Sequence, residues 1–147
     1  MCPKMRLTAF TDYSLRVLMY VAARPDRLVR IREMAAAYGI SQNHLMKVVY
    51  ELGRHGILET VRGRGGGIRL ARPQEEIRIG DVVRFTEAGT ALVECFGTGS
   101  ECVIVGPCRL KGILNEAREA FLGVLDRYTL DDLVRGNRGL ARSLKAA

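Results

Sequence analysis

The sequence predicts a mainly α-helical protein with one small β-hairpin and one long helix in its C-terminal half. Three observations lead to this fold class. Apolar residues recur every three or four positions in three stretches of the N-terminal half. Two short strand-like runs flank a glycine-rich segment, as in a hairpin. A further apolar stripe at helical spacing continues through residues 110–128.

Three helices are expected before the hairpin. The first begins at Thr11 or Asp12, whose side chains suit an N-cap, and ends near Ala23, just before a turn that contains proline. The second helix spans residues 30–38 and the third spans residues 41–54. Their apolar residues fall on one face of each helix, which predicts a common core.

The stretch 31–50 has the spacing of a helix-turn-helix. Gly39 suits the left-handed turn after the second helix, and the small Ala35 lets two helices approach closely. In such motifs the start of the following helix enters the major groove, where polar side chains hydrogen-bond base edges. The candidates for DNA contact are Gln42, Asn43, His44 and Lys47. An ordinary solvated helix face is the alternative interpretation.

The hairpin is formed by runs 57–61 and 68–70 on either side of a glycine-rich turn. Arg62 and Arg64 stand on this turn, and a wing of this kind places arginine in the narrow minor groove of DNA. A nucleotide phosphate loop is the rival interpretation, but no Gly-Lys-Ser/Thr follows the glycines. The sequence therefore predicts a winged helix-turn-helix domain over residues 5–72.

Charge supports a polyanionic partner for this domain. The chain has a formal net charge of +7. Residues 1–72 hold 13 Lys and Arg against 5 Asp and Glu, whereas residues 73–147 hold 10 against 11. A localised basic surface favours nucleic acid. No apolar run is long enough to span a bilayer, and the first residues lack a signal-peptide core, so we expect a cytoplasmic protein without a membrane partner.

Four further segments follow the winged domain. Residues 73–94 are a connecting region with a short helix, and residues 95–108, rich in Gly, Ser and Cys, are expected to form a loop. Residues 109–134 carry the long helix and a short helix, and residues 135–147 are expected to be a flexible basic tail. The apolar stripe of the long helix needs a surface to pack on, and the simplest expectation is that a second copy of the chain supplies it.

Three of the four cysteines lie in the 95–108 segment. Cys95, Cys102 and Cys108 are separated by six and five residues, which are wider gaps than structural zinc fingers use. In a reducing cytosol, clustered thiols indicate metal or redox chemistry rather than disulfides. Because thiolates bind iron–sulfur clusters, zinc and copper(I), the residues alone leave a cluster, a zinc site and redox-active thiols all open.

Several motifs together resemble a known family. They are Met5-Arg6-Leu7-Thr8, Phe10-Thr11-Asp12-Tyr13, Tyr38-Gly39-Ile40-Ser41, His44-Leu45-Met46-Lys47 and Cys95-Phe96-Gly97. On these residues the chain resembles the winged-helix iron–sulfur transcriptional regulators of the IscR, RirA and NsrR type, from residue 5 to about residue 134. The His-Leu-Met-Lys and Cys-Phe-Gly segments are most similar to the NsrR branch, whose members are nitric-oxide-sensing repressors.

The resemblance implies a homodimer with a long antiparallel dimerisation helix over about residues 108–128. It also implies an iron–sulfur cluster, for which we prefer 4Fe–4S over 2Fe–2S. The implied ligands are Cys95, Cys102, Cys108 and the partner subunit's Asp12. Lys111 stands where IscR-like members have a histidine ligand, so this position cannot supply the fourth ligand here. Without the resemblance, Asp12 would be explained as a carboxylate that favours the helix dipole.

The function that these features predict is a cluster-dependent repressor, not an enzyme, that binds a palindromic DNA operator and responds to nitric oxide. Loss of the Asp12 bond would free the winged domains to reorient and change the half-site spacing. A sensor of iron or cluster status on the same fold is the first alternative. A small redox or cluster-transfer protein and a zinc-stapled or metal-free winged-helix protein are the others.

Overall fold

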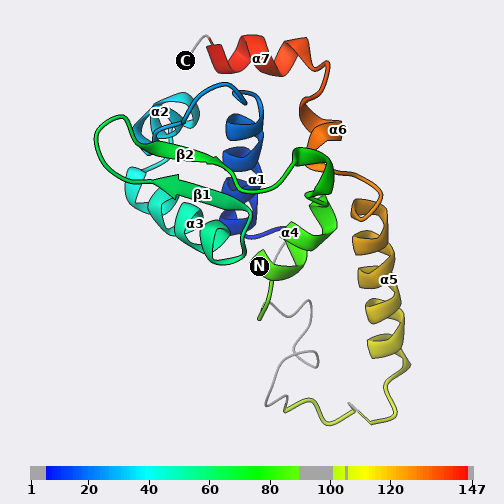
Figure 1. The fold of residues 1–147 in the computed structure, drawn as a ribbon. Coiled ribbons are helices and arrows are strands. Elements are labelled where there is room, and N and C mark those ends of the chain that lie inside the picture. The colour runs from blue at the N-terminus through cyan, green and yellow to red at the C-terminus, as the bar shows by residue number, and fades with distance from the viewer. Residues whose placement is uncertain (1–5, 90–100, 105, 146–147) are drawn as a thin grey trace.

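The computed structural model describes residues 6–89, 101–104 and 106–145. The structure is mainly helical with one antiparallel hairpin, as predicted. The elements of the N-terminal half are α1 (Ala9–Ala22), α2 (Ile31–Tyr38), α3 (Gln42–Arg54), β1 (Leu58–Val61) and β2 (Gly67–Leu70). The remaining elements are η1 (Gln74–Glu76), α4 (Ile79–Thr86), α5 (Arg109–Leu125), α6 (Leu130–Val134) and α7 (Arg138–Lys145). Figure 1 shows α5 standing to one side of the winged domain, beyond α4.

Helix α1 begins three residues earlier than the sequence analysis expected. Its N-cap is Thr8, whose hydroxyl accepts a hydrogen bond from the backbone N–H of Thr11 at 3.2 Å. Thr11 cannot serve as the cap because its side chain is fully buried and contacts the Thr86 hydroxyl at 2.8 Å. Asp12 therefore lies inside the first helical turn, where a negative charge favours the helix dipole.

The turn between α2 and α3 follows the prediction. Gly39 adopts a left-handed conformation with φ of 64° and ends α2. Ser41 is the N-cap of α3, and its hydroxyl accepts a hydrogen bond from the backbone N–H of His44 at 3.2 Å. The two caps fix the angle at which α3 leaves the turn.

The hairpin pairs Leu58 with Leu70 and Val61 with Gly67. Ile68 also exchanges two backbone hydrogen bonds with Val29, at 2.8 and 2.9 Å, which adds a third extended segment at the base of the hairpin. A side chain on Gly67 would place its Cβ 2.8 Å from the Val29 carbonyl oxygen, so only glycine permits this approach.

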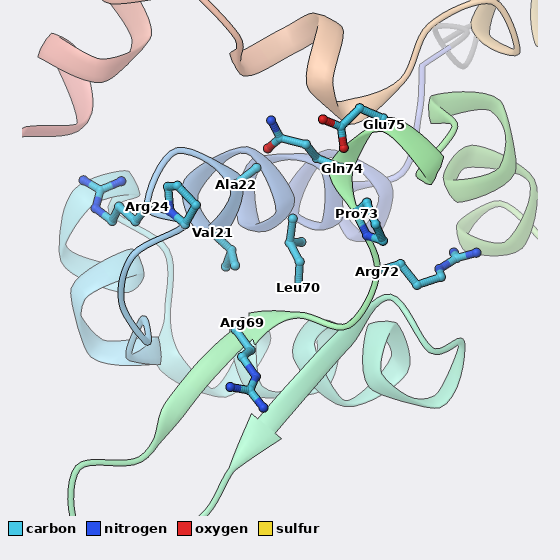
Figure 2. Close-up of a pocket in the computed structure, with 10 residues that line it drawn as sticks. Val21, Ala22, Arg24, Arg69, Leu70, Arg72, Pro73, Gln74 and Glu75 are labelled. Atoms are coloured by element: carbon cyan, nitrogen blue, oxygen red, sulfur yellow. The ribbon is translucent and has the colours of Figure 1, made fainter.

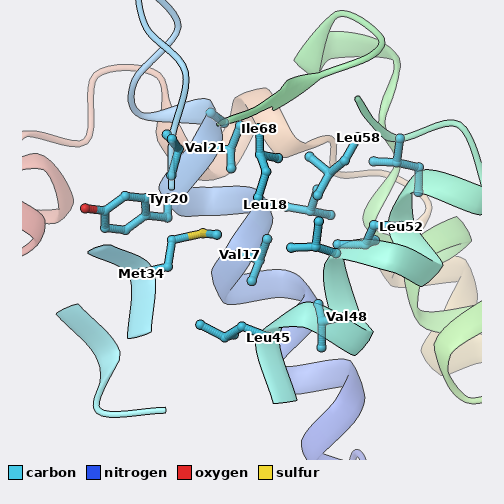
Figure 3. Packing of buried hydrophobic residues seen from close by; sticks show 14 of the residues in the cluster. Val17, Leu18, Tyr20, Val21, Met34, Leu45, Val48, Leu52, Leu58 and Ile68 are labelled. Carbon is cyan, nitrogen blue, oxygen red and sulfur yellow. The ribbon is translucent and has the colours of Figure 1, made fainter. Parts of the chain in front are cut away.

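The core lies between α1, α3 and the hairpin, as Figure 3 shows. Each of its central side chains is at most 3% exposed; they are Val17, Leu18, Met34, Leu45, Val48, Leu52, Leu58 and Ile68. Burial of one such aliphatic side chain contributes about 1.5–3 kcal/mol, so the contact between α1 and α3 holds α3 firmly.

The structure differs from the prediction at the C-terminus, where a flexible tail was expected. Helix α7 packs on the core through Leu140 and Leu144, and Leu144 is only 6% exposed. The Arg24 guanidinium lies 3.7 Å from the centre of the Tyr20 ring and donates a hydrogen bond to the Leu144 carbonyl oxygen at 3.0 Å. The two leucines are four residues apart and form an apolar face that the basic composition concealed.

Helix α5 rests on α4 through a small cluster formed by Ile79, Val83 and Leu122. Arg84 of α4 reinforces this contact with two hydrogen bonds to the carboxylate of Asp126, at 2.5 and 2.7 Å. Leu114 and Leu125 of α5 are partly buried. Five large apolar side chains of α5 and the turn after it are exposed: Leu110, Ile113, Phe121, Val124 and Tyr128. Within the described ranges, no helix is long and apolar enough to cross a membrane.

Candidate nucleic-acid interface and cluster ligands

The start of α3 presents the polar residues that were predicted to read DNA. The buried side of the helix is Leu45, Val48, Val49 and Leu52, which pack on the core. The predicted contacts Gln42, Asn43, His44 and Lys47 are all exposed on the outward side. Among the residues that the structure describes, none of these four side chains makes a hydrogen bond or ion pair. They are thus available to an external partner.

Two large side chains on the same helix were missed by the sequence analysis. Met46 is 55% exposed and Tyr50 is 65% exposed. The Arg54 guanidinium lies 6.0 Å from the centre of the Tyr50 ring. Apolar groups on a recognition helix contact thymine methyl groups in the major groove. The signal was present in the sequence, because positions 46 and 50 are out of phase with the buried face of α3.

Arg62 and Arg64 lie exposed at the tip of the hairpin, which Figure 1 shows projecting away from the core. The turn that carries the two arginines requires glycine at two positions, Gly63 and Gly66. The backbone N–H of Gly66 donates to the Gly63 carbonyl oxygen at 3.0 Å, and Gly63 has a φ of 98°. A Cβ at Gly66 would clash with the Val61 carbonyl oxygen at 2.2 Å. The wing therefore presents its arginines on a hydrogen-bonded turn.

Asp12 lies on the first turn of α1 with its side chain 48% exposed. Its carboxylate oxygens contact the Arg16 guanidinium at 3.0 and 3.1 Å. An exposed ion pair at this helical spacing contributes only about 0.3–0.5 kcal/mol. The carboxylate can therefore exchange Arg16 for another partner at small energetic cost.

The residues around Asp12 contact the helix-turn-helix directly. The ring of Tyr13 lies 6.1 Å, centre to centre, from the ring of His44 at the start of α3. The Tyr38 hydroxyl donates a hydrogen bond to the Arg16 carbonyl oxygen at 2.9 Å, just before the turn at Gly39. Burial raises the pKa of Tyr38 to about 12, so this phenol keeps its proton and remains a donor.

Two of the three expected cysteine ligands lie in the described part of the chain. Cys102 and Cys108 are half-buried, and Cys95 lies outside the described residues. Cys108 is the N-cap residue of α5, whose first turn has no acidic residue and carries Arg109 and Lys111. The N-terminal end of a helix and two cations favour the negative charge of a thiolate-ligated cluster. This donor chemistry fits iron–sulfur ligation.

The described ranges of one chain gather no group of three or more potential metal ligands. This observation leaves the predicted ligand set untested, because Cys95 is not described and Asp12 is expected to serve the partner subunit. The prediction of Asp12 as a ligand therefore depends on the accessibility of its carboxylate and on the family resemblance.

A pocket of about 360 Å³ lies between the end of α1 and strand β2, and Figure 2 shows its lining. Its arginines do not converge on the cavity. Arg24 lies on the Tyr20 ring, Arg69 binds the Glu59 carboxylate at 2.8 Å, and Arg72 extends away from the space. The pocket thus lacks the convergent polar groups of a small-molecule site.

Comparison with known proteins decides the family. The model of the Rrf2 family, described as iron-dependent transcriptional regulators, matches residues 7–136. The chain belongs to the Rrf2 family. This Rrf2 protein is 53% identical to the HTH-type transcriptional regulator NsrR of Bacillus subtilis (strain 168), over 96% of this chain and 98% of that protein. It is 50% identical to protein aau3 of Rhizobium meliloti (strain 1021), over 89% of this chain and 86% of that protein.

Solved structures of the family share the fold. The oxidised form of CymR from Staphylococcus aureus matches with a TM-score of 0.73 and 26% identity, over 89% of this chain and 97% of that chain. IscR of T. potens matches with a TM-score of 0.72 and 21% identity, over 92% of this chain and 90% of that chain. The predicted fold class is confirmed. This Rrf2 protein is a DNA-binding transcriptional regulator and not an enzyme.

Proposed function

We propose that this Rrf2 regulator is an iron–sulfur-dependent repressor that binds a palindromic operator as a homodimer and responds to nitric oxide. The observation that carries the proposal is the position of Asp12. Its carboxylate is accessible and weakly held, while its neighbours contact the turn and the start of the recognition helix. Similarity to proteins named NsrR, over nearly the whole chain, supports the nature of the signal.

The dimer is supported by the exposed apolar face of α5. Its large side chains are 43–60% exposed in a single chain, at positions that repeat with helical spacing. A contiguous apolar surface of this kind marks a protein interface. A two-fold pairing of α5 helices would give a dimer with two recognition helices, which matches a palindromic operator.

Cys95, Cys102 and Cys108 of one subunit and the partner subunit's Asp12 would hold the cluster, for which 4Fe–4S is the preferred type. The bound cluster would supply an iron with an exchangeable oxygen ligand, which is open to a small diatomic molecule. Cys108 places its sulfur at the positive end of α5, where negative charge is favoured. The four side chains thus link the winged domain of one subunit to the cysteine segment of the other.

The chain's own residues would transmit the signal. A bond from Asp12 to the partner's cluster would compete with its ion pair to Arg16. Loss of that bond would leave Asp12 paired with Arg16, whose carbonyl oxygen accepts the hydrogen bond of Tyr38. Tyr13, next to Asp12, contacts His44 on α3. A small rotation of α1 would therefore change the orientation of the recognition helix and weaken operator binding.

Operator binding before and after addition of nitric oxide, without oxygen, tests the proposal. The operator is first selected from random DNA with the cluster-loaded protein. We expect nitric oxide to reduce affinity at least about tenfold, a change of 1.4 kcal/mol. The variant Asp12→Ala should lose this response, whereas Asp26→Ala, at an exposed aspartate in the turn after α1, should keep it. Unchanged affinity after nitric oxide would refute the switch, and a response only to an iron chelator would favour a sensor of cluster status.

A further inference from the structure

A carboxylate outside the expected ligand set is bound to the start of α1. Glu87 is the C-cap residue of α4. Its Oε1 atom accepts hydrogen bonds from the backbone N–H of Thr8 at 2.8 Å and from the Thr8 hydroxyl at 2.9 Å. The buried Thr11 hydroxyl also contacts this oxygen and lies 2.8 Å from the Thr86 hydroxyl. We name Thr8, Thr11, Thr86 and Glu87 the threonine clasp.

The threonine clasp joins the start of α1, which carries Asp12, to the end of α4. The first backbone N–H groups of a helix have no partner within the helix, and a negative charge there is favourable. Glu87 supplies that charge from α4, 79 residues along the chain from Thr8. Hydrogen bonds to an ionised acceptor are stronger than neutral ones. The first turn of α1 therefore cannot turn away from α4 without breaking several of them.

Asp12 directly follows Thr11 on this turn, so the clasp fixes the direction in which its carboxylate leaves α1. From the proposed function, on which this inference rests, we propose that Glu87 is a positioning residue for Asp12. It holds the first turn of α1 so that Asp12 reaches the cluster of the partner subunit. Glu87 thereby acts on the cluster of the other subunit, although it lies only eight residues before Cys95 of its own chain.

The alternative is that Glu87 supports the cysteine segment of its own subunit. The geometry favours the first role, because Oε1 of Glu87 is occupied by donors of the α1 start. The two roles make opposite predictions in a mixed dimer. If Glu87 acts through Asp12, its substitution should destabilise the cluster of the partner subunit. If Glu87 acts locally, its substitution should destabilise the cluster of its own chain.

Three variants test the clasp in the homodimer. Glu87→Ala removes the acceptor, Glu87→Gln keeps an oxygen in the same place, and Glu76→Ala is an exposed control on η1. In the metal-free protein, we expect Glu87→Ala to speed amide hydrogen exchange at the start of α1 at least about tenfold, with a smaller effect for Glu87→Gln and none for Glu76→Ala. Unchanged exchange in Glu87→Ala would overturn the clasp.

Mixed dimers then separate the two roles. With the proposed ligands, a chain with Cys108→Ala would hold no cluster. The single cluster of the mixed dimer would then belong to the other chain and take its fourth ligand from the Cys108→Ala chain. We expect cluster loss to a chelator, followed by absorption, to be at least about tenfold faster when Glu87→Ala is placed in the Cys108→Ala chain. Glu87→Ala in the cluster-holding chain should leave the rate unchanged.

The outcomes distinguish this inference from the proposed function. The reverse pattern, or equal rates in the two mixed dimers, would overturn the positioning role while leaving the cluster proposal intact. A wild-type protein that takes up no cluster under anaerobic reconstitution would instead refute the proposed function, and with it the role of Glu87.

Discussion

Tyr38 joins the turn of the helix-turn-helix to α1 through both its hydroxyl and its ring. The hydroxyl donates to the Arg16 carbonyl oxygen at 2.9 Å, and the ring packs edge-on against Tyr20 with ring centres 5.9 Å apart. The Arg16 guanidinium lies 5.9 Å from the centre of the Tyr38 ring. Because Tyr38 directly precedes Gly39, these contacts hold the start of the turn against α1.

The variant Tyr38→Phe should lower the free energy of unfolding by about 0.5–1.5 kcal/mol near neutral pH, because it removes one hydrogen bond. It should also change the alkaline pH dependence. Burial raises the pKa of Tyr38 to about 12 in the folded protein, against about 10 in the unfolded chain. The stability that the neutral phenol contributes is therefore complete below pH 10 and is lost as the pH rises from about 10 to about 12.

Urea unfolding at pH 8 to 11 measures both effects. In Tyr38→Phe the loss of stability between pH 10 and 11 should be smaller than in the wild type. Tyr50→Phe is the matched control, because Tyr50 is 65% exposed. Equal alkaline slopes for the wild type and Tyr38→Phe would contradict the assignment.

At the residue level, short-range sequence patterns correctly predicted the C-cap residue of α2 and the N-cap residue of α3. They did not predict the N-cap residue of α1. Ser41 and Gly39 were identified because the residue type and the neighbouring apolar pattern agree. Thr8 was missed because Thr8, Thr11 and Asp12 are all suitable caps by residue type. What decides between them is that Thr11 is buried against α4 by a contact 75 residues away in sequence, which no local pattern contains.

Among the elements, the hairpin was predicted almost residue by residue, because glycine and β-branched residues act locally. Helix α7 was not, because three basic residues in a short segment masked the apolar pair Leu140 and Leu144. The two leucines pack on the core, and Arg24 donates a hydrogen bond to the Leu144 carbonyl oxygen. Without knowledge of these partners, the pair alone does not predict a packed helix. Contacts with residues distant in the sequence thus hold α7 in a folded, packed state.

The wing is the element whose contribution to DNA binding is most easily isolated. The double variant Arg62→Gln/Arg64→Gln should weaken binding to the selected operator and reduce the slope of log affinity against log salt by about 2, since each arginine replaces about one counterion. Folding stability should not change, because both side chains are exposed. Fluorescence anisotropy at several salt concentrations measures the slope.

Arg72→Gln is the matched control for this measurement, since Arg72 is also exposed but follows the end of β2 farthest from the tip. It should leave the slope nearly unchanged. A double wing variant with the wild-type slope would show that the hairpin does not contact DNA.

In the molecule as a whole, the winged domain shares one large buried core with residues such as Leu130 and Leu144 of the C-terminal half, whereas α5 contributes no residue to that core. Among the residues of α5, all of which the structure describes, Leu122 is the only one that is fully buried, and it packs against α4. Most of the apolar stripe that the sequence analysis assigned to a partner subunit is exposed in the single chain, while Leu114 and Leu125 are partly buried. The sequence located this surface because helical periodicity is local. It could not show which side of α5 would be covered by α4, since Ile79 and Val83 lie about forty residues earlier.

The variant Phe121→Glu should convert the proposed dimer into a monomer. A charge placed in the centre of the α5 apolar face would have to be buried without a partner, which strongly disfavours association. By helical periodicity, Asn115 lies on the opposite side of α5, so Asn115→Glu is the matched control and should remain dimeric.

Because a monomer engages only one half-site, its affinity for a palindromic operator should fall about a hundredfold or more. Sedimentation equilibrium and operator binding on the same samples measure the two effects. A wild-type protein that sediments as a monomer, or a Phe121→Glu protein that remains dimeric, would exclude this face of α5 as the contact that spaces the two recognition helices.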